Sequence, residues 1–215
     1  MGDFLQFVVD RRDDIIELTI EHAILVVQVM VVATVVAVVI GIVAHGRPLA
    51  RTLALSITGV FLTVPSFALF GLFIPFLGLG FRPTFAALLL YSLLPIVRNT
   101  ITGLEQVDAA VLESAKGMGM GSFRRLTQVQ LPLAWPVILT GVRVSTLLTV
   151  GIAAIAAVVN GPGLGDFIFS GLSRLGGANA DYLVYAGTLF TVLLALLFDV
   201  AFLFVRRLTT SKGLR

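Results

Sequence analysis

The chain lacks cysteine and carries little charge. Of its 215 residues none is cysteine, and only 13% are Asp, Glu, Lys or Arg. The missing cysteine excludes disulfides and thiolate metal sites, and it gives no indication of the redox compartment of the protein. Soluble globular chains carry about 25% charged residues. The deficit of charge, together with a hydrophobic fraction of 58%, indicates an integral membrane protein, and the length allows a single domain.

Catalytic and metal-binding groupings are also missing. The two histidines, His22 and His45, stand at opposite ends of one apolar run and cannot meet within one chain. No cluster of His, Asp and Ser is present, so an enzyme is the least expected class, and no cofactor, metal or nucleic acid is expected. Gly117, Gly119 and Gly121 lack the preceding strand and the Lys-Ser/Thr pair of a phosphate-binding loop. Nucleotide binding by this chain is therefore not expected.

Residues 1–21 lack the basic start, short apolar core and small-residue cleavage site of a signal peptide. They carry six acidic residues against Arg11 and Arg12. Their apolar residues recur at helical spacing, which predicts an amphipathic interfacial helix that leads into the first span. We expect residues 22–208 to form one transmembrane domain and residues 209–215 to form a cytoplasmic tail.

Five apolar runs are each long enough to cross a membrane, which takes about 20 residues. They cover residues 23–44, 52–81, 83–104, 133–159 and 182–205. The runs are long and continuous, whereas the strands of a membrane barrel are short and alternating. An all-α polytopic membrane bundle is therefore predicted. Pro65 and Pro75 lie inside the second run, where each is expected to kink or end a helix.

Five spans place the two termini on opposite sides of the membrane, and the distribution of basic residues predicts which side is which. Ten basic residues fall on one side: Arg47, Arg51, Arg98, Lys116, Arg124, Arg125, Arg206, Arg207, Lys212 and Arg215. Four fall on the other: Arg11, Arg12, Arg82 and Arg174. The positive-inside rule puts the first group in the cytoplasm, so the N-terminus is expected outside and the C-terminus inside.

Residues 113–132 form a charged, glycine-punctuated segment in an otherwise apolar chain. Glu113, Ser114 and Ala115 open it, Gly119 follows, and it closes with an apolar residue, a spacer, Leu131 and Pro132. This register resembles the EAA loop of binding-protein-dependent ABC-transporter permeases, with serine in place of the middle alanine. The charge count includes Lys116, Arg124 and Arg125 of this segment but none of the motif residues, and it places the segment on the side where an ATPase would be.

The local sequence predicts a helix–turn–helix knob over residues 108–132. Asp108 is a predicted helix N-cap, Ser122 is expected to cap a second short helix over residues 123–130, and Pro132 is expected to end it. The resemblance implies that this loop docks on the ATPase and couples its motion to the membrane helices. The residues expected to carry that coupling are Glu113, Ser114, Ala115, Gly117, Gly119, Arg124, Arg125, Leu131 and Pro132.

Three more segments resemble the osmoprotectant branch of these permeases: residues 63–69, 94–103 and 161–171. The resemblance implies the type I ABC importer permease fold in a bacterial or archaeal cell membrane. It also implies two ATP-binding subunits that hold ATP and magnesium, a second permease chain and a separate extracellular solute-binding protein. The expected cargo is glycine betaine, choline, carnitine or a proline-like solute. Methionine-importing permeases share the coupling loop and are the close alternative, and a non-transporting scaffold or channel is the alternative of another class.

Two ionisable residues, Arg143 and Asp199, fall inside predicted spans, where charges are rare and usually paired or cavity-facing. Both belong to the inner half of the membrane, so an ion pair between them is favoured over a gating or solute-binding role. Asn99 is expected to hydrogen-bond across helices. On the outer side, one segment supports two interpretations equally: a gate or binding-protein dock, and a packed loop. The segment contains Gly161, Gly163, Gly165, Asp166 and Phe167.

Overall fold

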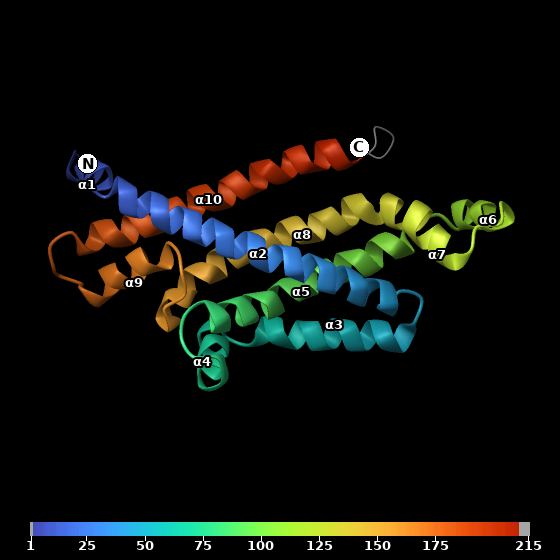
Figure 1. Cartoon of the computed structure of the whole chain (residues 1–215), viewed down its shortest axis with the longest axis horizontal. Helices are drawn as coiled ribbons and strands as arrows, with labels where there is room; N and C mark the ends of the chain where they lie inside the picture. Colours follow the sequence, from blue (N-terminus) through green and yellow to red (C-terminus); the bar gives the residue numbers. More distant parts are fainter. Residues whose placement is uncertain (1, 211–215) are drawn as a thin grey trace.

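The computed structural model describes residues 2–210, and every regular element in that range is a helix. The long helices run roughly along one axis and form a bundle (Figure 1). Residue 1 and residues 211–215, which include most of the expected cytoplasmic tail, lie outside the described residues. The predicted all-α membrane bundle is confirmed: four helices are long and apolar enough to cross a membrane, or five if one bent pair counts as a single span.

The N-terminal region, for which the sequence predicts an amphipathic interfacial helix leading into the first span, contains a short helix and the start of a long one. Helix α1 (Gly2–Asp10) is short, and α2 begins at Arg12 and runs without a break to Ala44. Residues 12–21 therefore extend the first membrane helix, because no proline or glycine interrupts the helical spacing there. Phe4 and Phe7 pack against Tyr182, with ring centroids 5.8 Å apart in both pairs.

The second apolar run is broken into two helices. Helix α3 (Pro48–Thr63) and helix α4 (Ser66–Leu77) meet at an angle of 97°. The break comes at Pro65, as the sequence predicts, because a proline disfavours helical backbone in the residue before it. The carbonyl of Val64 that the break exposes accepts a hydrogen bond from the hydroxyl of Tyr91.

Helices α5 (Phe81–Glu105) and α8 (Leu131–Ala153) form the centre of the bundle and pack along a seam of small residues. A Cβ built at Gly141 would lie 2.8 Å from Pro95 O, and one at Gly103 would lie 3.0 Å from Ala134 O. Such close backbone approach is typical of helix pairs in membranes, where lipid supplies no hydrophobic drive for helix association. The two central helices are therefore built to behave as one unit.

Buried hydroxyls reinforce this seam. Ser145 Oγ donates to Ser92 O at 2.7 Å, and the hydroxyls of Ser92 and Thr149 are 2.9 Å apart. The expectation for Asn99 is wrong, because its amide donates to Pro95 O of its own helix at 2.8 Å. Gly141 brings the α8 backbone against the Cβ of Asn99, which leaves the amide to bond within α5.

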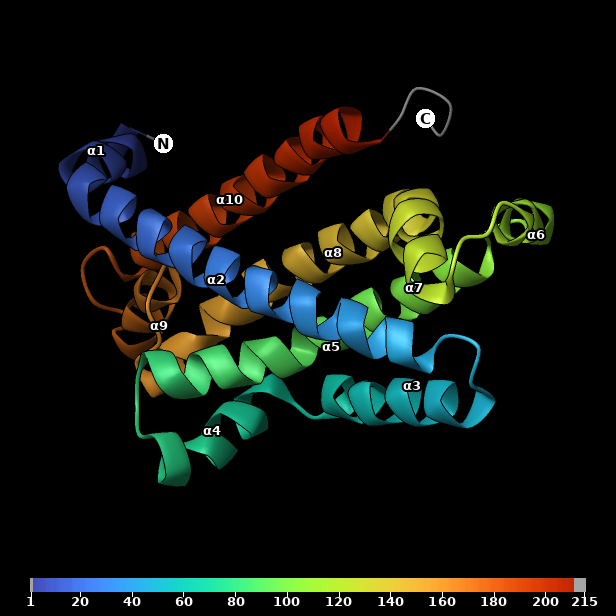
Figure 2. The same cartoon turned by 45° about the vertical axis from the view of Figure 1, so that its right-hand side comes forward.

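The last helix, α10 (Ala180–Thr209), lies at the edge of the bundle beside α8 (Figures 1 and 2). Most of its apolar residues are exposed, so in a membrane they face lipid or another protein chain. Two polar ties hold it to α8: the ion pair of Arg143 with Asp199, and a hydrogen bond from Trp135 Nε1 to Thr209 Oγ1 at 2.9 Å. Its N-terminal half packs instead on α9 (Gly165–Ser173).

Candidate functional site

A helical knob projects from one end of the α5–α8 pair (Figure 1). Its first helix, α6 (Ala109–Gly117), begins as the sequence predicts, because Asp108 Oδ1 accepts a hydrogen bond from Ala110 N at 2.8 Å. This cap satisfies one of the backbone donors that a helix start leaves free, and it favours a start at this residue. The helix carries Glu113, Ser114 and Ala115, of which only Ala115 is buried.

The turn after α6 depends on Gly119, whose φ is +81°. Met120 N donates to Ala115 O and Gly119 N donates to Lys116 O, at 3.1 and 3.0 Å. These two bonds are those of the Schellman ending, which satisfies the last carbonyls of a helix and favours glycine at its left-handed position. Gly117 and Gly121 do not have a positive φ, so of the three glycines only Gly119 is required by the turn.

The second arm of the knob does not end at Pro132, and this part of the sequence prediction is wrong. Helix α7 (Ser122–Arg125) continues through a π-helical turn, η1 (Leu126–Gln130), directly into α8. In the wide turn Leu131 N donates to Leu126 O, one residue further back than in an α-helix. The change of register coincides with Pro132, which has no N–H to donate and occupies the first turn of α8, where proline is tolerated.

Several charged and apolar side chains of the knob are exposed. Glu113 is exposed and makes no ion pair with any described residue. Among the same residues, the Arg124 side chain donates only to Gln128 of η1, from Nε to Oε1 at 2.9 Å. Met118 and Phe123 are 71% and 79% exposed. Met118 also lines a shallow apolar pocket of about 310 Å³, together with Ala110, Val111, Ser114, Ala115 and Val129. The sequence analysis missed the apolar side chains of Met118 and Phe123. Their position among glycines and arginines, outside any span, was the available signal.

The knob is joined directly to the centre of the bundle. It follows α5 after only a short link, and α7, η1, α8 and η2 form one continuous helical segment from Ser122 to Val159. Of the predicted coupling residues, Glu113 to Arg125 lie on the knob, whereas Leu131 and Pro132 lie in the first turn of α8. Both central helices are therefore joined directly to the knob.

Arg143 and Asp199 meet in the structure. The guanidinium donates from Nε to Oδ1 at 2.6 Å and from its second terminal nitrogen to Oδ2 at 2.8 Å, a two-point geometry that favours Arg over Lys. The side chains remain 36% and 27% exposed, so the pair faces outward from this chain between α8 and α10. Because exposed charge at membrane depth is unfavourable in lipid, this side of the pair needs water or another protein chain.

The predicted outer segment is tightly packed. Gly161, Gly163, Gly165 and Phe167 are buried, and only Asp166 is exposed. The segment follows a 3₁₀ turn, η2 (Ala154–Val159), and leads into α9, so it reverses the chain at the end opposite the knob. Phe167 packs with Phe7 and Ile15 of the first two helices and with Leu183 and Ala186 of α10.

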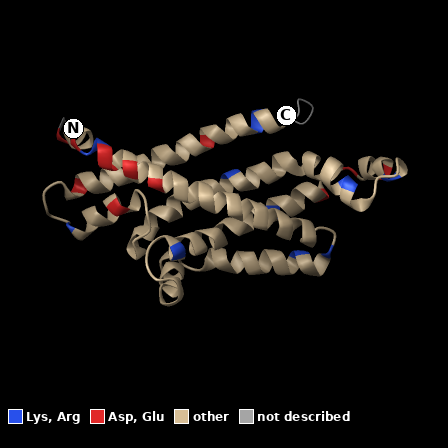
Figure 3. Ribbon diagram, viewed as in Figure 1, with Lys and Arg blue, Asp and Glu red and all other residues tan. Residues whose placement is uncertain are grey.

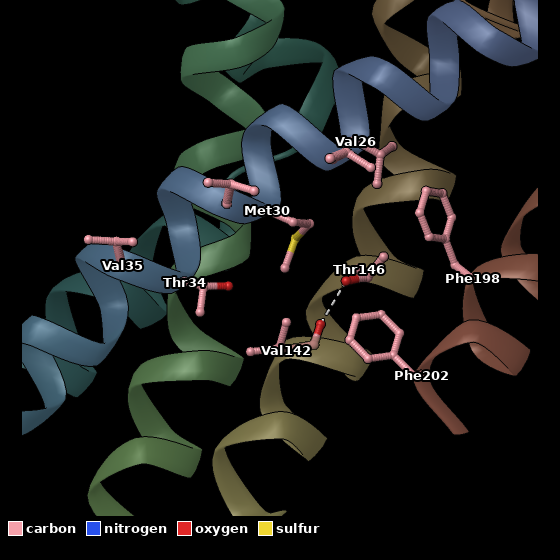
Figure 4. A pocket seen from close by; sticks show the side chains of 10 residues that line it. Val26, Met30, Thr34, Val35, Val142, Thr146, Phe198 and Phe202 are labelled. Atoms are coloured by element: carbon pink, nitrogen blue, oxygen red, sulfur yellow. Dashed lines mark hydrogen bonds between the residues drawn. The ribbon is translucent and has the colours of Figure 1, made fainter. Parts of the chain in front are cut away.

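An apolar pocket of about 380 Å³ lies between α2, α8 and α10 (Figure 4). Val26, Met30 and Val35 contribute from α2, Val142 from α8, and Phe198 and Phe202 from α10. Its hydroxyls are those of Thr34 and Thr146, and Thr146 already donates to Val142 O at 2.8 Å. A charged or zwitterionic solute finds no ionic partner among these residues, so this pocket is suited to apolar groups.

The fold and the projecting knob define the class of the protein, an importer permease. A solved structure of the MetNI methionine ABC transporter, in inward-facing conformations, has a chain that matches with a TM-score of 0.79 and 21% identity over 92% of this chain and 96% of that chain. The fold is that of a type I ABC importer permease, as the sequence resemblance predicts. The protein belongs to the family of binding-protein-dependent transport system inner membrane components, which it matches over residues 24–210.

Curated relatives refine this assignment. The chain is 34% identical to the glycine betaine/carnitine/choline transport system permease protein OpuCB of Bacillus subtilis, over 100% of this chain and 97% of that protein. It is 36% identical to the osmoprotectant import permease protein OsmW of Salmonella typhimurium, over 99% of this chain and 100% of that protein. The resemblance to the osmoprotectant branch is thus confirmed, and the chain is a multi-pass protein of the inner membrane.

Proposed function

We propose that this chain is the membrane-spanning subunit of an ATP-driven importer of compatible solutes such as glycine betaine, choline, carnitine or proline-like compounds. The observation that carries the proposal is the similarity to osmoprotectant permeases over the whole length of the chain. The MetNI likeness, at 21% identity, supports the fold and does not favour methionine as cargo.

The proposed complex contains two ATP-binding subunits, which hold ATP and magnesium, a second permease and a separate extracellular binding protein. Support comes from the family and from the knob, whose Glu113, Met118 and Phe123 are exposed among the residues that the structure describes. The basic residues of the turn between α2 and α3 and of the start of α3 lie toward the knob, and acidic residues gather around α1 and the start of α2 (Figure 3). We therefore assign the knob end to the cytoplasm by the positive-inside rule, with the N-terminus outside.

In the proposed mechanism, nucleotide-driven closure of the ATPase pair moves the knob as a rigid body. Because the knob continues into α5 and α8, and these pack backbone against backbone, the central pair tilts as a unit. The solute crosses between two permease chains, since the apolar pocket inside this chain has no group suited to a charged solute. The chain itself makes and breaks no covalent bond.

Uptake by reconstituted vesicles tests the function. Vesicles with this chain, its ATPase and its binding protein are given labelled glycine betaine, with labelled methionine in parallel. We expect ATP-dependent betaine uptake that disappears when this chain is left out. Methionine uptake alone would move the chain to the alternative cargo, and uptake of neither solute with no dependence on the ATPase would favour a scaffold or channel.

We also propose that the Arg143–Asp199 pair is a structural tie that holds α10 on α8. Removing one charge leaves the other unpaired at membrane depth, so Asp199→Leu is expected to lower the amount of folded complex in the membrane. Exchange of the two charges, in Arg143→Asp with Asp199→Arg, is expected to restore much of that amount. Full accumulation of Asp199→Leu with loss of uptake would instead assign the pair to gating.

A further inference from the structure

His22 is a buried polar residue that neither the coupling knob nor the ion pair accounts for. Its side chain is fully buried on α2, at the end of the bundle opposite the knob. It contacts two segments far away in the sequence, because its Nε2 lies 3.1 Å from Val150 O and its Nδ1 accepts a hydrogen bond from Leu164 N at 3.3 Å. A carbonyl only accepts and a backbone N–H only donates, so the ring bridges them as a neutral imidazole with its hydrogen on Nε2.

The bridge lies at the end of α8, where the helix passes into the 3₁₀ turn η2. The imidazole Nε2–H donates to the carbonyl of Val150, in the last turn of α8. A carbonyl oxygen has two lone pairs, so it can accept this bond in addition to one within the helix. The bond ties α2 to the end of α8 in a buried position, where loss of one partner of a hydrogen bond is unfavourable.

The outer segment is shaped to receive the ring. Gly163 has φ +115° and lies so close to α2 that a Cβ there would be 2.8 Å from His22 Cβ and 2.9 Å from Nδ1. Both groups bound by the ring belong to the backbone, so the contact depends on the position of the segment and not on the identity of its side chains. The bridge thus fixes three elements at one point: α2, the end of α8 and the turn before α9.

The same helical segment links this bridge to the knob. Residues 122–159 form the helical segment that runs from the knob to the end of η2, and Val150 lies within it, so displacement of the knob acts on a segment that is held by His22 near its far end. We propose that His22 is the positioning residue that latches the outer segment closed against α2, and that the Val150–His22–Leu164 bridge opens when the transporter turns outward. This inference rests on the proposed function.

The cysteine-free sequence gives a clean test by thiol labelling. Leu164 is fully buried, so Leu164→Cys reports exposure of the latched segment while its backbone N–H remains. The full complex with its binding protein is placed in lipid nanodiscs and treated with a fluorescent maleimide, at rest and after trapping with ATP, magnesium and vanadate. We expect slow labelling at rest and labelling at least several times faster in the trapped state.

Variants at His22 assign that change to the bridge. In the Leu164→Cys background, His22→Leu is expected to raise the resting rate about fivefold, the effect of losing roughly one net hydrogen bond. His22→Gln keeps one donor and one acceptor and is expected to remain near the parent rate. Ser173→Cys, which is exposed in α9, labels in every state, and Ala87→Cys, which is fully buried in α5, stays unlabelled unless the variant unfolds.

Equal labelling of Leu164→Cys at rest and in the trapped state would overturn the latch, as would a resting rate that His22→Leu leaves unchanged. Labelling needs no knowledge of the cargo. Failure of betaine uptake with a normal labelling response would therefore reject the proposed function and keep the latch, and the reverse result would do the opposite.

Discussion

Two glycine triplets with the same spacing stand at opposite ends of the molecule, and their surroundings are opposite. Residues 117–121 read Gly-Met-Gly-Met-Gly, and residues 161–165 read Gly-Pro-Gly-Leu-Gly. A Cβ built on any glycine of the first triplet meets nothing within 4 Å. A Cβ built on any glycine of the second meets other atoms closer than 3.0 Å.

The difference separates two uses of glycine in one chain. In the outer triplet the missing side chains let the turn lie against α2 and the end of α8, so the space is already filled by this chain. In the knob triplet the space is empty, which suits a surface that another protein approaches closely. The outer end is therefore packed by the chain itself, whereas the knob end, where we propose that the ATPase docks, is left open.

The largest expected effect is that of Gly165→Ala. Its Cβ would fall far inside contact distance of the backbone carbonyl of Ala154, and backbone cannot move aside as a flexible side chain can. We expect a loss of about 3 kcal/mol or more in the free energy of unfolding, at the upper end of overpacking effects. Thermal unfolding of the purified permease and its amount in membranes measure this. Wild-type values for both would contradict the close packing.

Gly163→Ala should have the next largest effect, about 1–3 kcal/mol, because its φ of +115° is strained for alanine and the new Cβ meets His22. The unfolding midpoint of the permease is the measurement. If the latch is real, the variant also raises the resting labelling of Leu164→Cys. A midpoint equal to that of the parent would show that the turn adapts to a side chain.

Gly119→Val tests the knob, where a side chain at this position is limited by the backbone conformation and not by the available space. A left-handed residue other than glycine costs about 1–2 kcal/mol, and valine is among the least suited. We expect normal insertion but ATP hydrolysis that is uncoupled from uptake, because the ending of α6 is distorted. Gly119→Asn is the matched control, since asparagine tolerates this conformation. Wild-type uptake by the valine variant would reject the coupling role.

The smallest effect is expected for Gly117→Ala, at the last residue of α6. No atom lies within 4 Å of the new Cβ, and alanine restricts the unfolded chain more than glycine does. The permease purified without its ATPase should gain less than about 1 kcal/mol in stability. A loss as large as that of Gly165→Ala would remove the difference between the two triplets.

Local features of the fold were predictable from sequence because their causes are local. Apolar runs of spanning length predict the long helices, Pro65 predicts the break before α4, and Asp108 predicts the start of α6. The depths of Arg143 and Asp199 along their helices made their meeting expected. The wrong expectation for Pro132 arose because the π-helical turn before it depends on how the knob joins α8 and leaves no clear mark on the sequence.

The sequence by itself determined that this is a helical membrane protein, and its glycine, charge and Leu-Pro register indicated the permease family. Tertiary structure alone decided the 97° bend between α3 and α4, the partner groups of His22 and the opposite surroundings of the two glycine triplets. The physical reason is the distance along the chain over which each effect acts. Hydrophobicity and helix breaking act over a few neighbouring residues, whereas His22 meets Val150 and Leu164 at sequence separations of 128 and 142.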